Sequence, residues 1–88
     1  MKIREGYILR SIVNSWIVIP TGSNLTDFTE MLKLNDSSAL IWKMLESDVE
    51  QEDLVSMLMS EYGIDQATAS VDVEDILNIF KGKGLIVE

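Results

Sequence analysis

The stretch Met31–Leu45, MLKLNDSSALIWKML, decides the fold, because its pattern changes from strand to helix within a few residues. Its first four residues read as a half-buried β-strand. The polar run NDSS that follows is typical of a helix N-terminus. The remainder is apolar except for Lys43, as in a helix that is covered on most sides. The sequence therefore predicts a strand that enters a buried helix with almost no loop.

The strand is expected to span Thr29–Leu34, with Leu32 and Leu34 facing inward and Met31 and Lys33 facing outward. The helix should begin at Asn35 or Asp36. Both residues are favourable N-caps, and the carboxylate of aspartate also suits the positive end of the helix dipole.

Upstream of this stretch, two apolar and β-branched runs, Tyr7–Val13 and Trp16–Ile19, predict a hairpin. Asn14-Ser15 is the expected turn, because asparagine tolerates a positive φ. Pro20 should end the second strand, since proline cannot donate to a ladder.

Downstream, the pattern predicts two more helices. One should span about Val49–Glu61, with Asp48 and Gln51 as a variant of the capping box and Gly63 as its left-handed end. The other should start after Asp65 as N-cap and run to Phe80. A glycine, at position 82 or 84, should end it before a short apolar tail, Leu85–Val87. Its apolar stripe consists of Ala69, Val73, Ile76, Leu77 and Phe80.

The 88 residues are expected to form a single domain, residues 1–88. A small antiparallel sheet packed against three helices buries every apolar face. The predicted fold class is therefore α+β, a winged-helix-like arrangement with a three-stranded antiparallel sheet followed by three helices. Trp42, in the first helix, is expected to anchor the core.

The composition excludes several kinds of site. The chain contains no Cys and no His, which removes thiolate chemistry, the commonest general base and the commonest metal ligand. Asp72 and Asp75 could share a helix face, but solvated surface is the favoured interpretation of such a pair. We expect no catalytic residue, no metal and no cofactor. Without an apolar run long enough for a signal peptide or a membrane span, a cytoplasmic protein is expected.

Charge is unevenly distributed along the chain. The net charge is −8, yet Met44–Phe80 alone holds ten acidic residues and no Lys or Arg. A helix that reads DNA must bring basic side chains to phosphates, so no nucleic-acid binding is expected. Two interpretations of the acidic segment stay open: a solvated face that keeps the protein dispersed, and a patch that steers a basic partner.

Several short motifs resemble the PqqD family. They are Gly6-Tyr7-Ile8-Leu9-Arg10, Leu34-Asn35 followed by Ala39 and Ile41-Trp42, Asp72-Val73-Glu74-Asp75-Ile76-Leu77, and the closing Gly84-Leu85-Ile86. That family comprises small peptide-binding proteins that assist pyrroloquinoline quinone (PQQ) biosynthesis. Related domains that serve other ribosomally made, post-translationally modified peptides (RiPPs) are called RiPP recognition elements. The resemblance covers nearly the whole chain.

The resemblance implies a non-catalytic protein. Such a protein binds the leader of a precursor peptide by strand addition and presents it to a modifying enzyme, often a radical SAM protein, in PQQ or related RiPP biosynthesis. The alternative is a structural or dimerisation module, a homodimer included, that uses the same sheet edge. The implied peptide-binding residues lie on the third strand and the third helix. They are Glu30, Met31, Leu32, Lys33, Leu34, Asp72, Val73, Ile76, Leu77 and Phe80.

Overall fold

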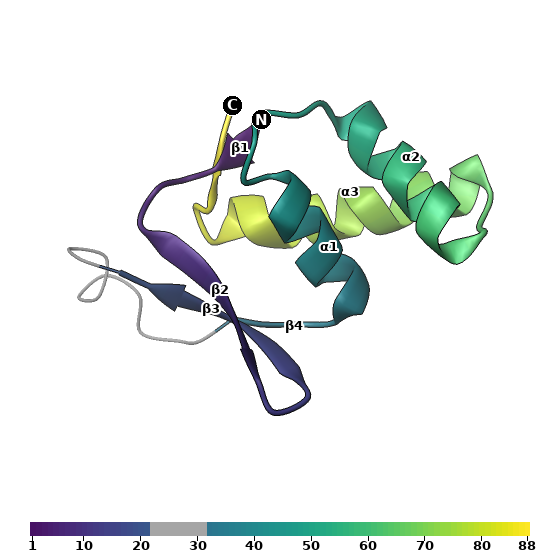
Figure 1. The fold of residues 1–88 in the computed structure, drawn as a ribbon. Helices are drawn as coiled ribbons and strands as arrows, with labels where there is room; N and C mark the ends of the chain where they lie inside the picture. The colour runs from purple at the N-terminus through teal and green to yellow at the C-terminus, as the bar shows by residue number, and fades with distance from the viewer. Residues whose placement is uncertain (22–31) are drawn as a thin grey trace.

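The computed structural model of the chain describes residues 1–21 and 32–88. It contains a three-stranded antiparallel sheet, a separate two-stranded sheet and three helices, with the helices on one side of the larger sheet (Figure 1). This arrangement confirms the predicted α+β class. In chain order the elements are β1 (Lys2–Ile3), β2 (Tyr7–Ile12), β3 (Ser15–Pro20), β4 (Leu32–Leu34), α1 (Asp36–Met44), α2 (Gln51–Tyr62), α3 (Gln66–Gly82) and β5 (Ile86–Val87).

The larger sheet has the strand order β2-β3-β4. β4 is the third strand expected from the sequence, and it lies at an edge. In its register with β3, Trp16 is opposite Leu34 and Val18 is opposite Leu32. Leu34 is buried and Lys33 is exposed, as the alternation predicts. The expected strand residues Thr29–Met31 fall outside the described part of the chain.

The β2–β3 hairpin turns one residue earlier than predicted. Ile12 pairs with Ser15, so Val13 and Asn14 form the two-residue connection. The positive φ belongs to Val13, at 54°, and Asn14 has none. A β-branched residue rarely adopts this conformation, which is why asparagine was the expected candidate. The strand pairing, set by the inward side chains of both strands, overrides the local preference.

The helix termini follow the sequence prediction at three sites and depart from it at one. Asn35 caps α1 and Asp65 caps α3, and Gly63 ends α2 with a φ of 63°. The prediction of Asp48 as the N-cap of α2 is wrong. Glu50 is the N-cap, and its backbone N–H donates to the Asp53 carboxylate at 2.9 Å. Asp48 instead binds the N-terminus of the chain.

The core lies between the sheet and the helices. Trp42 on α1 is 1% exposed, and its ring meets that of Phe80 on α3 edge to face, with centroids 5.6 Å apart. Trp42 is thus a core residue, as predicted. The α3 stripe is confirmed for four of its residues, while Ile76 is half-buried at its margin. The buried four are Ala69, Val73, Leu77 and Phe80.

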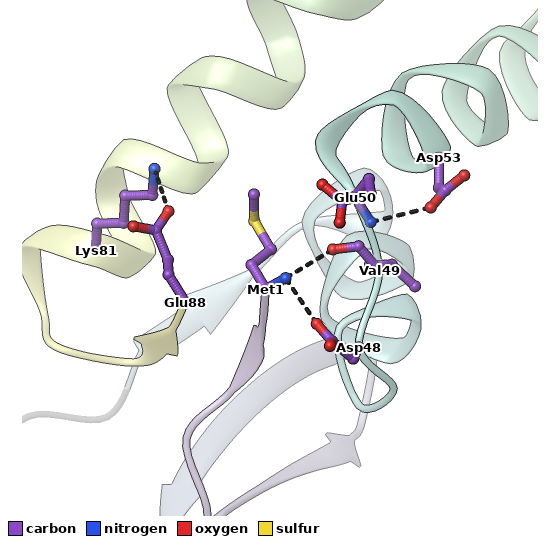
Figure 2. A network of polar contacts seen from close by, with 7 residues as sticks. All are labelled: Met1, Asp48, Val49, Glu50, Asp53, Lys81 and Glu88. Atoms are coloured by element: carbon purple, nitrogen blue, oxygen red, sulfur yellow. Dashed lines mark hydrogen bonds and ion pairs between the residues drawn. The ribbon is translucent and has the colours of Figure 1, made fainter.

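The two ends of the chain meet in a small sheet that the sequence did not reveal. β1 pairs with β5 through Lys2 opposite Val87 and Ile3 opposite Ile86. The backbone N–H of Ile3 also donates to the Leu45 carbonyl at 2.7 Å. Beside this sheet, the Met1 ammonium donates to the Asp48 carboxylate at 2.7 Å and to the Val49 carbonyl at 2.9 Å (Figure 2). These contacts hold the α1–α2 connection against the first strand.

The Met1–Asp48 pair predicts a pH-dependent stability. The hydrogen bond that the Met1 ammonium donates to Asp48 raises the pKa of the ammonium, and the same hydrogen bond lowers the pKa of Asp48. The ammonium contributes stability below its unfolded pKa and loses it as the pH rises through its folded pKa. The carboxylate contributes above its unfolded pKa and loses it as the pH falls through its folded pKa. The pair therefore stabilises the fold at pH values between the lowered pKa of Asp48 and the raised pKa of the Met1 ammonium.

We expect Asp48→Asn to lower the thermal midpoint near neutral pH, and the difference from wild type to vanish at both extremes. The measurement is a series of thermal melts across pH on chains that keep Met1 as the first residue. Glu46→Gln, at an exposed acid of the same connection, is the control with the same charge change. Equal midpoint differences for the two variants at every pH would contradict the prediction.

Candidate functional site

The edge strand β4 is held in place by the helix that follows it. Only Asn35 separates Leu34 from the first residue of α1. The Asn35 side-chain oxygen accepts hydrogen bonds from the backbone N–H of Ser38 at 2.9 Å and from its hydroxyl at 2.7 Å. The Ser37 hydroxyl donates to the same oxygen at 3.0 Å. The Asn35 side chain thus caps α1 directly after the last residue of β4, and no loop separates the strand from the helix.

A second set of contacts ties α1 to the middle strand. The Trp16 indole N–H donates to the Asp36 carboxylate at 3.2 Å. The Lys43 ammonium lies 4.2 Å from the centre of the same ring, within the range of a cation–π interaction. Because Trp16 is also opposite Leu34 in the sheet, β3, β4 and α1 form one connected unit. The sheet edge is therefore presented on a rigid support.

No described strand pairs with the outer side of β4, since the sheet order ends there. An edge of this kind presents backbone N–H and C=O groups to an incoming strand. β2 is the opposite edge of the same sheet. The edge at β4 differs from it in having α1 begin directly beside it.

α3 presents a second, partly apolar side next to its buried stripe. Asp72, Ile76 and Ile79 follow the spacing i, i+4, i+7, so they share one side of the helix. Ile79 is 52% exposed, Ile76 is half-buried and Asp72 is exposed. This side is named the α3 flank below. Of the residues that the family resemblance pointed to, the flank contains Asp72 and Ile76.

Three other residues from the same prediction lie inside the core. Val73, Leu77 and Phe80 are each at most 2% exposed, so a ligand bound at the surface would not contact their side chains directly. On β4, Leu32 is half-buried, Lys33 is exposed and Leu34 is buried. Glu30 and Met31 lie outside the described residues.

A pocket of about 250 Å³ connects α3 with the start of α1. Asp72 lines it from the α3 flank, and Ser37 lines it from the first turn of α1, three residues beyond the end of β4. Asp72 of the flank and the first turn of α1 thus line the same pocket. The other lining residues come from the end of α2 and the turn after it. They are Leu58, Tyr62 and Ile64.

The sequence did not identify these residues as part of a binding site. Periodicity describes one helix at a time, whereas this pocket is formed by residues from all three helices. Tyr62 is 45% exposed, although an aromatic ring is usually buried. An apolar residue at the end of a helix, just before a left-handed glycine, is the signal that was available. This signal marks the position of Tyr62 as unusual, but it does not predict which residues of α1 and α3 lie near it.

The site is acidic on its helical side. All ten acids between Met44 and Phe80 lie in the described part of the chain, which has no group of three or more His, Cys, Asp or Glu side chains that could hold a metal ion. Asp65 serves its helix: the Thr68 backbone N–H, which donates to it at 2.8 Å, lowers its pKa. No described helix is both long and apolar enough to cross a membrane.

The three-stranded sheet followed by three helices is a winged-helix-like α+β fold. The family model described as coenzyme PQQ synthesis protein D (PqqD) matches residues 15–86. The chain therefore belongs to the PqqD family. No curated relative matches it.

Two solved structures share this fold over nearly their whole length. One is TbiB1 in complex with the TbiA(beta) leader peptide, which is 25% identical, has a TM-score of 0.77 and is matched over 97% of this chain and 93% of the other. The second is lasso peptide synthetase B1 complexed with the leader peptide, at 22% identity and a TM-score of 0.76, with 99% and 96% covered. The second likeness concerns the fold alone.

Proposed function

We propose that this chain binds the leader of a ribosomally made precursor peptide as an added strand at β4 and presents it to a peptide-modifying enzyme. The observation that carries the proposal is the sheet edge at β4, which runs directly into α1, in a member of the PqqD family. TbiB1, which has the same fold, is described with a leader peptide bound. Backbone hydrogen bonds would supply affinity in this mode, and side-chain pockets would supply specificity.

The α3 flank gives the added strand something to bind besides the edge. An exposed hydrogen bond contributes only about 0.5–1.5 kcal/mol net, and fixing each peptide residue costs a comparable amount. Apolar anchors must supply the surplus. In this proposal Ile76 and Ile79 receive alternate apolar side chains of the leader, and the pocket at Asp72 and Tyr62 receives one more.

A non-catalytic role accompanies this proposal. The chain has neither His nor Cys, and the proposed site is built mainly from backbone groups and apolar side chains, with Asp72 lining its pocket. The modifying enzyme would supply the chemistry, with a radical SAM enzyme of PQQ or related RiPP biosynthesis as the first candidate. We place the complex in the cytoplasm, where the precursor peptide is synthesised.

Amide chemical shifts test the proposed function. On titration with the leader peptide encoded beside the chain, we expect the largest changes in Leu32–Leu34 and along Asp72–Ile79. Changes confined to Tyr7–Ile12 would place the peptide on the opposite sheet edge. A spectrum that changes with protein concentration and not with peptide would favour the dimerisation alternative.

A further inference from the structure

The larger sheet has a second face, which meets the proposed leader site only at Lys33. In an antiparallel sheet, residues directly opposite each other point to the same face. Ile8 is opposite Ile19, and Ile17 is opposite both Arg10 on β2 and Lys33 on β4. These residues alternate with those facing the core, and they point away from the helices. Together with Ile12, they are named the outer sheet face: Ile8, Arg10, Ile12, Ile17, Ile19 and Lys33.

The outer sheet face is apolar and lacks cover from the core. Ile8 and Ile12 are 37% and 45% exposed. Within residues 1–21 and 32–88, the half-buried residues packed against the core include Leu9 on the inner face but neither Ile17 nor Ile19. Ile17 and Ile19 are half-buried without being part of the packing around the core. The four isoleucines are grouped on one side of a small sheet, whereas apolar residues on an ordinary surface are scattered singly.

The hairpin extends this face beyond the body of the domain. In Figure 1 the tip of the β2–β3 hairpin stands clear of the three helices. The burial pattern agrees, because Arg10, Ser11 and Ile12 are all exposed, whichever face they occupy. The tip residue Val13 is 88% exposed. An apolar hairpin tip in this position is accessible to a large partner.

The charge of the outer sheet face is opposite to that of the rest of the molecule. β2, β3 and β4 carry Arg10 and Lys33 and no acidic residue. The whole chain has a net charge of −8, and its excess of acid lies on the helical side, between Met44 and Phe80. A partner with acidic groups would be attracted to the sheet face and repelled by the helices, which orients the encounter.

Resting on the function proposed above, we infer that the outer sheet face is the docking surface for the peptide-modifying enzyme. The matching surface on that enzyme is an apolar patch bordered by carboxylates. A second copy of the chain fits less well, because a symmetric contact would bring Arg10 and Lys33 towards their own counterparts. Strand addition would use the edge of the sheet at β4 and not this face, so leader and enzyme could bind together.

The test separates enzyme binding from leader binding. The variants Arg10→Glu and Ile12→Glu change exposed positions outside the leader site, and Val71→Glu is the control at an exposed apolar position of α3, 58% exposed. The probes are the purified modifying enzyme and the leader peptide encoded beside the chain. Enzyme affinity is measured by biolayer interferometry and leader affinity by calorimetry, after melts confirm that each variant is folded.

We expect both sheet variants to weaken enzyme binding roughly tenfold or more, with leader affinity and the Val71→Glu control unchanged. Rising salt should weaken wild-type binding more than that of Arg10→Glu. Unchanged enzyme affinity, or no enzyme binding by wild type, overturns the inference. So does a wild-type dimer, or binding to anionic vesicles, that the sheet variants abolish. A wild-type chain that fails to bind the leader contradicts the proposed function instead.

Discussion

Replacing Trp42 by alanine should lower the free energy of unfolding by about 3–5 kcal/mol, because it removes a large buried side chain and leaves a cavity. The ring is 1% exposed and meets Phe80 edge to face across the α1–α3 contact. A domain of this size has a total stability of about 5–10 kcal/mol, so the loss takes much of the margin. Urea denaturation followed by circular dichroism is the measurement, since the mutation removes a fluorophore.

Trp16→Ala is the matched control for this prediction. Trp16 is half-buried and is held by Asp36 and Lys43 at the edge of the core. Its loss should cost less, on the order of 1–2 kcal/mol, because less apolar surface is buried and the remaining partners are exposed to water. Equal midpoints for wild type and Trp42→Ala would show that the ring is not a core anchor.

Ile76→Glu and Ile79→Glu should each weaken leader binding by roughly 2 kcal/mol, about 30-fold in Kd, because a carboxylate would replace an apolar anchor of the groove. Both side chains lie on the α3 flank, and Ile79 is 52% exposed, so the second variant should fold normally. The measurement is calorimetric titration of each variant with the leader peptide.

Val71→Glu is the control on the same helix. Val71 is 58% exposed and lies on the opposite side of α3 from the core stripe, so the same charge is added away from the flank. Its leader affinity should stay within error of the wild-type value. An equal loss in all three variants would mean that added negative charge, and not the flank, reduces binding.

The local signals of the sequence placed most of the elements correctly, because each depends on neighbours in the chain. Asn35 and Asp65 cap their helices because a side-chain oxygen reaches a backbone N–H three residues ahead in each case. Gly63 ends α2 because its φ of 63° is easily reached only without a side chain. The order of strands and helices, the inward face of β4 and the burial of Trp42 follow from periodicity alone.

Where two local signals competed, the tertiary structure chose between them. Asp48 and Glu50 are both acids before α2, and Asp48 is the stronger N-cap by preference. Asp48 binds the ammonium of Met1, which is 47 residues away in the chain, and Glu50 caps the helix instead. At the hairpin, the register of β2 against β3 places the positive φ on Val13, although Asn14 would adopt it more easily.

The candidate site shows the same division. Periodicity predicted a third strand and an amphipathic third helix, and the family resemblance suggested that the strand lies at a sheet edge and that the two act together. Only the assembled chain sets Asp72 beside Ser37 in one pocket, and only it removes Val73, Leu77 and Phe80 from the surface. The pairing of β1 with β5 was also decided by the tertiary structure. Each of these strands has only two residues, too few to show a hydrophobic period, and they pair because the path of the whole chain brings its ends together.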